Sequence, residues 1–256
     1  MLESKIIEKK YALIIVLAVY QEFELLHDIV NQIKKKLSGI SHCIILSHNG
    51  KHSLTRQICF NIAKEKENIV ALQTEEAGIG YAYTKAINYL TEHESLFPAA
   101  WVIFWAADLP FNFSDLESFF FHQGKSEFLT ISCYVGSKSH PESQCPRPLA
   151  RKLMSAVYRF FNKTILSLTT SDPQGSIFIQ LSLLSTMGRM VRSKDFLFST
   201  ELIYRLEKNG HHVREIPITY IGEKRKSTVK PIKDGYAMLR GLLRLRLCSS
   251  NASRRR

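Results

Sequence analysis

WAADLPFN, residues 105–112, closes an apolar run, AAWVIFWAADLPF (99–111), which predicts a buried β-strand that ends at a single carboxylate, Asp108. In α/β proteins the carboxyl ends of parallel strands form the edge at which ligands bind. A metal site at such an edge commonly has a second carboxylate, whereas this chain has Ala106 two residues earlier. The stretch therefore predicts a sheet with a site at its edge, and it leaves open whether that site has kept its chemistry.

Strand-like and helical patterns alternate on the N-terminal side of this stretch. Strand-like apolar runs fall at 11–20, 42–47 and 68–73, and helical patterns at 21–37, 53–66 and 79–93. Ser53 is the expected N-cap of the second helix. Such alternation with short connections predicts an α/β fold, a mostly parallel sheet with helices on both faces.

The second half of the chain is less regular. We expect a strand at 128–138, a proline-rich loop at 141–148, a long helix at 147–168, a turn and apolar run at 171–184, a helix at 194–210 ended by Gly210, a strand at 211–220, a basic loop at 223–235 and a short helix at 236–247. Because no repeat or low-complexity linker interrupts the chain, we expect one domain over 1–247 and a flexible basic tail at 248–256.

The formal net charge of +12 is concentrated near the C-terminus. Residues 205–256 contain 14 Lys and Arg and 4 Asp and Glu, a net of +10. Such a segment favours an anionic partner, which leaves nucleic acid, a phosphorylated substrate, an anionic membrane surface or a merely solvated tail. Proteins that bind single-stranded nucleic acid need aromatic residues interleaved with the basic ones. The basic loop has no such aromatic residues, so we expect no nucleic-acid partner.

Three further features bear on the environment of the protein. No apolar run reaches the roughly 18–20 residues that a membrane span needs. The charged N-terminus lacks the apolar region of a secretory signal, so we expect a cytoplasmic protein. The five cysteines have no zinc-ligand spacing and are expected to be free thiols.

Three motifs suggest binding chemistry. Asp108 can supply one oxygen ligand to Mg²⁺, with phosphate oxygens and waters as the others, or it can be a turn or capping residue before Ser114. The Gly-Ile-Gly at 78–80 permits close approach of a ligand to the backbone, or forms a plain turn. The basic loop EKRKSTVK (223–230) carries donors that suit phosphate oxygens, or is a solvated charge run. His211 and His212 are more typical of a surface than of a metal site.

Taken in order, these segments resemble the inverting glycosyltransferases of family two, and more closely the dolichol-phosphate mannose synthase and polyprenyl-phosphate glycosyltransferase branch. The resemblance runs from about residue 11 to about residue 247. The segments that carry it are LAVYQEFELL, EEAGIGYAYTKAI, AADL, YVGSK, SDPQGSIFI, REIPITY and RKSTVKPIKDGYAML.

The resemblance implies a GT-A fold, a GDP- or UDP-sugar donor, a Mg²⁺ or Mn²⁺ ion and a polyprenyl or dolichyl phosphate acceptor. It implies a protein on the cytoplasmic face of a membrane, and leaves open whether a membrane-spanning partner protein is needed. The nucleotide-sugar is expected at Ala18, Tyr20, Glu22, His48, Asn49, Gly78, Gly80, Ala106 and Ala107. Asp108 is the expected metal ligand, and it is expected to act in catalysis with Asp172. Lys138, Arg225, Lys226 and Lys230 are expected to bind acceptor and phosphate groups.

The chain departs from the family pattern at functional positions. His48 and Asn49 replace an acidic pair, Ala106 replaces the first acid of Asp-x-Asp, and Lys138 replaces an arginine. Because lysine lacks the bidentate fork of arginine, its contact with phosphate differs. Two hypotheses therefore stand, an active glycosyltransferase and a catalytically impaired protein that keeps the fold for binding or for a partner.

Overall fold

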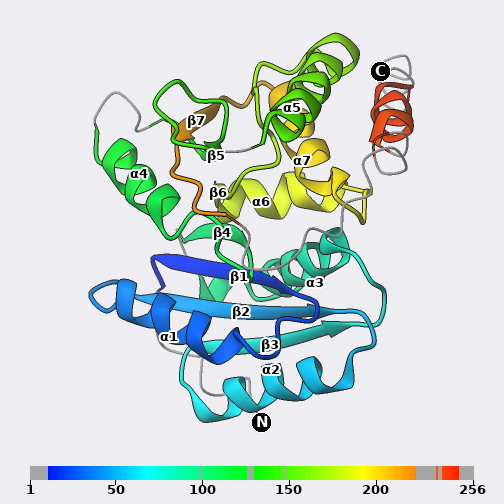
Figure 1. Ribbon diagram of the computed structural model, residues 1–256. Helices are drawn as coiled ribbons and strands as arrows, with labels where there is room; N and C mark the ends of the chain where they lie inside the picture. The colour runs from blue at the N-terminus through cyan, green and yellow to red at the C-terminus, as the bar shows by residue number, and fades with distance from the viewer. Residues whose placement is uncertain are drawn as a thin grey trace.

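A seven-stranded sheet organises the described part of the chain (Figure 1). The computed structural model describes residues 11–97, 100–125, 130–146, 148–222, 235 and 238–247. The strand order is β3-β2-β1-β4-β6-β5-β7. The strands are β1 (Leu13–Val19), β2 (His42–Asn49), β3 (Ile69–Thr74), β4 (Trp101–Ala106), β5 (Cys133–Ser137), β6 (Ile177–Gln180) and β7 (Val213–Pro217).

All strand pairs in this sheet are parallel except those of β6, which runs antiparallel to both β4 and β5. The helices are α1 (Leu26–Lys36), α2 (Ser53–Glu65), α3 (Ile79–Glu92), α4 (Ser114–Gln123), α5 (Leu149–Phe161), α6 (Leu181–Met187) and α7 (Leu197–Lys208). Residues 238–247 are also helical. The expected α/β fold, mostly parallel with helices on both faces, is confirmed.

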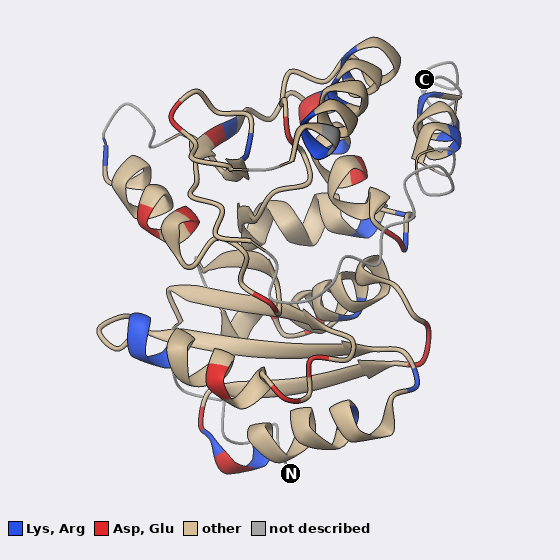
Figure 2. Cartoon of the chain, viewed as in Figure 1, with Lys and Arg blue, Asp and Glu red and all other residues tan. Residues whose placement is uncertain are grey.

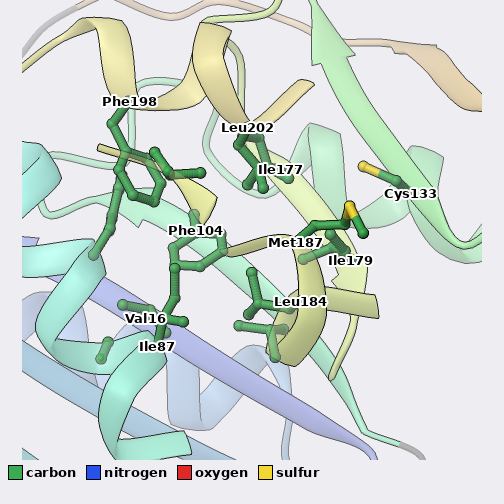
Figure 3. Packing of buried hydrophobic residues seen from close by; sticks show 14 of the residues in the cluster. Val16, Ile87, Phe104, Cys133, Ile177, Ile179, Leu184, Met187, Phe198 and Leu202 are labelled. Atoms are coloured by element: carbon green, nitrogen blue, oxygen red, sulfur yellow. The ribbon is translucent and has the colours of Figure 1, made fainter. Parts of the chain in front are cut away.

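Each face of the sheet has its own hydrophobic core, because successive strand side chains point to opposite faces. In β1, Ile14 and Val16 belong to one core with residues of α3, α6 and α7. Figure 3 shows this core, in which the rings of Phe104 and Phe198 lie 6.2 Å apart. Ile15 and Leu17 belong to the other core, with residues of α1, α2 and α4. The strands are apolar on both faces, as strands covered by helices must be.

Several predicted element boundaries were wrong. The second helix is capped by His52 rather than by Ser53, because the His52 ring accepts a hydrogen bond from the backbone N–H of Thr55 (3.3 Å). The first helix begins at Leu26 rather than at residue 21. The apolar run at 171–184 divides into β6 and α6 at Gln180, where no glycine or proline marks the change.

Two other boundaries differ. The long helix expected at 147–168 is α5, which passes into a π-helical turn (Asn162–Leu166) that ends at Ser167, a residue with φ of 56°. Of the strand expected at 128–138, the described part is β5. The prediction that Gly210 ends α7 is consistent with its φ of 80°, which suits glycine.

The remaining predictions concern thiols, membrane spans and the C-terminal segment. Cys43, Cys59 and Cys133 are free and buried, and burial raises the pKa of both Cys43 and Cys59 to about 12. Among the described residues, no helix is long and apolar enough to cross a membrane. The expected basic loop at 223–230, with Arg225, Lys226 and Lys230, and the tail at 248–256 lie outside the described residues.

Candidate functional site

The expected donor-site residues gather at the carboxyl ends of β1, β2 and β4. In the parallel register Ala18 lies opposite both Ser47 and Ala106, and Val19 lies opposite His48. Three segments that are far apart in the sequence therefore end side by side. This is the sheet edge at which α/β proteins bind ligands.

The chain turns sharply after β1 around the carboxylate of Glu22. The Oε2 atom of Glu22 accepts hydrogen bonds from the backbone N–H groups of Tyr20 (2.6 Å) and Gln21 (3.0 Å). The turn leaves the Tyr20 side chain 38% exposed, with its ring against Gly50. An ideal Cβ on Gly50 would lie 3.0 Å from that ring, and the φ of Gly50 is 95°. The site thus holds a half-exposed aromatic ring on a tightly closed turn.

His48 is buried at the end of β2, and neither ring nitrogen has a hydrogen-bond partner among the described residues. Burial lowers the pKa of His48, and the nearby His52 and Arg56 lower it further, while Glu22 acts in the opposite direction. An imidazole in these surroundings is neutral at pH 7. It offers one donor and one acceptor, which distinguishes it from the carboxylate of the family pattern.

The side chain of Asn49 is already engaged within the fold. Its Nδ2 donates to the carbonyl of Val19 (3.0 Å) and its Oδ1 accepts from the N–H of Gly78 (2.9 Å). The amide thus ties the end of β1 to the start of α3. Asn49 therefore positions the backbone around the site, and its predicted contact with a nucleotide stays a prediction.

At Gly78 and Gly80, another segment of the protein backbone lies close to the glycines. An ideal Cβ on Gly78 would lie 2.5 Å from the carbonyl oxygen of Lys194, and one on Gly80 would lie 2.5 Å from the Lys194 carbonyl carbon. The backbone at Lys194 thus fills the space that a Cβ would need at these glycines, and the predicted approach of a ligand to them stays a prediction. Glu201 holds this segment by accepting hydrogen bonds from the N–H groups of Arg192 (3.1 Å) and Ser193 (2.8 Å).

Asp108 lies in a tight loop between β4 and α4 and is buried. Burial raises the pKa of the Tyr83 phenol, and the negative charge of Asp108 raises it further. Leu109, Asn112 and Phe113 all have positive φ values, of 44°, 43° and 67°. Non-glycine residues adopt this conformation at a cost of about 1–3 kcal/mol each. The loop is therefore held in one unusual conformation by its surroundings.

Lys138 and Asp172 form the charged centre of the other half of the site. The Nζ atom of Lys138 lies 3.5 Å from the Oδ2 atom of Asp172, which also accepts from the backbone N–H of Lys138 at 3.0 Å. The same ammonium lies 5.8 Å from the ring centre of Phe111, in the Asp108 loop. These contacts join Lys138 to Asp172 and place Lys138 near the loop that contains Asp108, so three predicted site residues lie in one region.

Sequence reasoning missed the residues that hold Asp172 in place. Glu215 in β7 accepts hydrogen bonds from the backbone N–H groups of Ser171 (3.0 Å) and Asp172 (3.1 Å). Glu207 in α7 does the same for Thr169 (2.8 Å) and Thr170 (2.9 Å). Two carboxylates thus fix the segment 169–172. Each lies some forty residues from its partners in the sequence, so no local signal marks it.

A second missed residue is Asp115, a buried carboxylate behind the Asp108 loop. Its Oδ2 accepts from the indole N–H of Trp105 (2.8 Å), and its Oδ1 accepts from the N–H of Leu116 (2.9 Å). Burial raises the pKa of Asp115, while the hydrogen bonds from Trp105 and Leu116 lower it. Asp115 thus links the strand before the loop to the helix after it.

The segment that leads to the basic loop passes beside Asp108. The backbone N–H of Ile221 donates to the carbonyl of Pro110 (3.0 Å), and that of Thr219 donates to the Ser114 hydroxyl (2.8 Å). Residue 221 therefore lies against the Asp108 loop, two positions before the basic stretch begins. The predicted phosphate contacts of that stretch stay predictions.

The donor set suits a hard divalent cation that keeps part of its water shell. Within the described residues, no group of three or more His, Cys, Asp or Glu side chains could hold a metal ion. One carboxylate, Asp108, together with phosphate oxygens and water, is a ligand set that Mg²⁺ accepts. A cation at Asp108 would therefore depend on a bound diphosphate for its affinity.

No protein-family model matches the chain. Solved structures, however, are similar over almost its whole length. Glucosyl-3-phosphoglycerate synthase from Mycobacterium tuberculosis, in complex with Mn²⁺, uridine-diphosphate-glucose and phosphoglyceric acid, has a TM-score of 0.64 and 12% identity over 96% of this chain and 82% of that chain. The same enzyme in complex with uridine-diphosphate has a TM-score of 0.60, with 12% identity and the same coverage.

A further mycobacterial protein is similar, with a TM-score of 0.62 and 13% identity over 96% of this chain and 76% of that chain. These neighbours define the class of the fold, which is the GT-A fold of nucleotide-sugar glycosyltransferases. The GT-A fold expected from the resemblance is therefore confirmed. The dolichol-phosphate mannose synthase branch and the assignments of individual site residues stay predictions.

Proposed function

We propose that this protein is an inverting glycosyltransferase that moves a sugar from a nucleoside diphosphate-sugar to a phosphate-bearing acceptor. The observation that carries the proposal is the meeting of the Asp108 loop with the Lys138–Asp172 pair, through the ring of Phe111, at the ligand-binding edge of a GT-A sheet. One side of this site supplies a carboxylate for a cation, and the other supplies an ammonium for an anion.

The donor half of the site suits a nucleotide. The exposed ring of Tyr20 offers a face on which a base can stack, and the neutral His48 offers a donor and an acceptor at the end of β2. Asp108 would hold Mg²⁺ or Mn²⁺, which would neutralise charge on the diphosphate as it departs. The Mn²⁺ and uridine-diphosphate-glucose in a structurally similar enzyme support this arrangement.

The reaction needs no strong base from the protein. An oxygen of the acceptor phosphate attacks the anomeric carbon, and the bond from that carbon to the diphosphate oxygen breaks, so the electron pair leaves with the diphosphate. Because the acceptor is already an anion, positioning and charge stabilisation account for the rate. Lys138 would bind the acceptor phosphate, and Asp172 would orient Lys138.

A polyprenyl or dolichyl phosphate is the acceptor that we propose. The motif resemblance and the net charge of +10 over residues 205–256 support an anionic lipid substrate. The phosphoglyceric acid in a structurally similar enzyme is also phosphate-bearing, although soluble. A lipid acceptor implies a protein that works at the cytoplasmic face of a membrane.

The test is sugar transfer from UDP- and GDP-sugars to dolichyl phosphate and, separately, to phosphoglycerate, with Mg²⁺ or Mn²⁺ present. We expect transfer to the lipid that falls by about 100-fold in Asp108→Asn, the size of loss seen when a charge-stabilising group is removed. Asp28→Asn, at an exposed carboxylate in α1, is the control and should keep full activity. Transfer to phosphoglycerate alone would overturn the lipid acceptor, and no transfer from any donor would overturn the activity.

A second candidate is a GT-A-fold protein that binds nucleotide or a partner without turnover. Ala106 removes one expected carboxylate, and the amide of Asn49 is used within the fold. Both observations favour a weakened donor site. Nucleotide binding with no transfer to either acceptor would select this candidate.

A further inference from the structure

The helix α5 presents an apolar stripe to solvent. Leu149, Leu153, Val157 and Phe160 recur at spacings of four, four and three residues, which places them on one face of the helix. With Met154 beside them, their exposed fractions range from 41% to 82%. None of the described side chains in α5 is fully buried. Among the described residues nothing covers this apolar surface, and exposed apolar surface of this extent is typical of a binding face.

A row of basic residues borders this stripe. Helical spacing places Lys152 and Arg159 on one side of the stripe, and Lys163 follows in the π-helical turn. Residues 149–166 contain no Asp or Glu. The inner side of α5 faces the protein instead, where the hydroxyl of Tyr158 hydrogen-bonds that of Thr200 (2.6 Å). An apolar face flanked by cations is the pattern of a helix that lies in the interface of an anionic bilayer.

A second basic helix lies at the same end of the molecule. In the helix of residues 238–247, Leu242 and Leu245 are buried in the core that includes α7, while Leu243 and Leu247 are exposed. Arg240 and Arg244 are exposed on the same helix. Figure 2 shows the Lys and Arg residues of both helices toward the upper end of the view, away from α1 and α2.

The stripe also lies close to the proposed acceptor site. Arg159 of α5 donates from its Nη1 to the hydroxyl of Ser139 (3.0 Å), the residue after Lys138. Lys138 in turn pairs with Asp172. A surface that rests on α5 would therefore be adjacent to the ammonium that is proposed to bind the acceptor phosphate.

We propose that the face of α5 formed by Leu149, Leu153, Val157 and Phe160 docks on an anionic lipid bilayer, with Lys152, Arg159 and Lys163 at the level of the headgroups. Charge argues for lipid over a second copy, because two such faces together would oppose like charges without any acid between them. The role of this docking rests on the proposed function, because docking would present a lipid phosphate to Lys138. Membrane binding itself can be measured without a sugar donor or a metal ion.

The experiment is co-sedimentation of the full chain with vesicles of phosphatidylcholine, with and without phosphatidylserine, at about 0.15 M salt, where long-range attraction by the basic C-terminus is screened. We expect binding to the phosphatidylserine vesicles that falls by about tenfold or more in Phe160→Glu. Phe121→Glu is the matched control, because Phe121 in α4 is 63% exposed and Phe160 is 62% exposed. Equal binding of the two variants, or no binding of the parent protein, would overturn the proposal.

A second measurement does not depend on a charge change. Phe160→Trp should show a blue shift of its emission on addition of phosphatidylserine vesicles, and Phe121→Trp should not. The two native tryptophans, Trp101 and Trp105, are buried in the core, so their emission should change little. A dimer in light scattering that dissociates in Phe160→Glu would instead assign the face to a second copy and overturn the proposal. Vesicle binding without sugar transfer would leave this surface standing while the proposed function failed.

Discussion

The two halves of the site use their polar side chains differently. In the half built by β1, β2 and α3, the amide of Asn49 bridges Val19 and Gly78, and the Glu22 carboxylate closes the turn after β1. In the half built by β5, β6 and β7, Lys138 pairs with Asp172, whose backbone N–H is held by Glu215. The departures from the family pattern thus fall mostly in the donor half, while the acceptor half keeps a charged pair on a supported loop.

This contrast teaches that an altered motif need not mean a lost fold or a lost site. The donor half remains packed because Gly78 and Gly80 leave room for the backbone at Lys194. The amide of Asn49 also forms hydrogen bonds with the backbone at Val19 and Gly78. The acceptor half remains charged because carboxylates on two other elements support its loop. Four substitutions test this difference between the two halves, and the effects expected of them decrease in size.

The largest effect is expected at Gly175, where the loop after Asp172 approaches β5. An ideal Cβ at this position would lie 1.7 Å from the carbonyl oxygen of Gly136, so one of the two backbones would have to move. We expect Gly175→Ala to lower the free energy of unfolding by about 3 kcal/mol. Denaturant unfolding measures this, with Gly39→Ala as the control, because nothing lies within 4 Å of a Cβ there. Equal stability of the two variants would show that the acceptor half is not rigidly packed.

The second-largest effect is expected at Lys138, where a substitution should affect sugar transfer but not nucleotide binding. Lys138→Met removes the ammonium but keeps a long side chain, so we expect transfer to fall by about 100-fold, or about 2.7 kcal/mol. Nucleotide affinity, which depends on the donor half, should stay unchanged. Lys85→Met, at an exposed lysine of α3, is the control for both assays. A parallel loss of nucleotide affinity would mean that the halves are not separable.

A smaller effect is expected at Glu215. Glu215→Gln removes the charge that accepts from the N–H groups of Ser171 and Asp172, and charge-assisted hydrogen bonds of this kind contribute about 1.5–3 kcal/mol. Because the amide oxygen of glutamine can still accept one of them, we expect a loss of stability of about 1.5 kcal/mol. Thermal unfolding measures it against Glu142→Gln, at an exposed carboxylate. An unchanged melting temperature would mean that Glu215 does not hold this loop.

The smallest effect concerns the pH dependence of stability in the donor half. The pKa of His48 is lowered in the folded protein, so the unfolded chain binds the proton more readily. Its contribution is therefore fully present above pH 6.5, the ordinary pKa of histidine, and is lost as the pH falls below that value. We expect His48→Asn to flatten the decline in stability between pH 7 and pH 5. His212→Gln, at an exposed imidazole, should leave the decline unchanged.

Much of the fold was predictable because continuous apolar runs define β1 to β4, and helical stripes follow β1, β2 and β3. The helix that follows β4, α4, was not predicted. Two boundaries show where prediction failed. Gln180 and Leu181 separate a strand from a helix without a local break, and the Glu22 carboxylate delays the start of α1. The hydrophobic pattern could not reveal these boundaries, because the first has no glycine or proline to mark it and the second is set by side-chain hydrogen bonds to the backbone of the turn.

The site was predictable in part. Lys138 and Asp172 were selected from separate motifs, and the structure joins them at 3.5 Å. The contact of Gly78 and Gly80 with the segment at Lys194 was not predicted, because that segment comes from a distant part of the sequence. Glu215 was missed for the same reason. The sequence shows which residue types are present, but the fold decides which residues a glycine or a carboxylate contacts.

The central claim is that Asp108 supports a metal-dependent nucleotide site without an acid at position 106. Calorimetric titration of UDP and GDP, with and without Mn²⁺ or Mg²⁺, tests it most directly in the parent protein and in Asp108→Asn. The account predicts that one nucleotide binds at least about tenfold more tightly with the metal, and that Asp108→Asn abolishes this gain. Binding that ignores both the metal and the substitution, or no binding of either nucleotide, would contradict it.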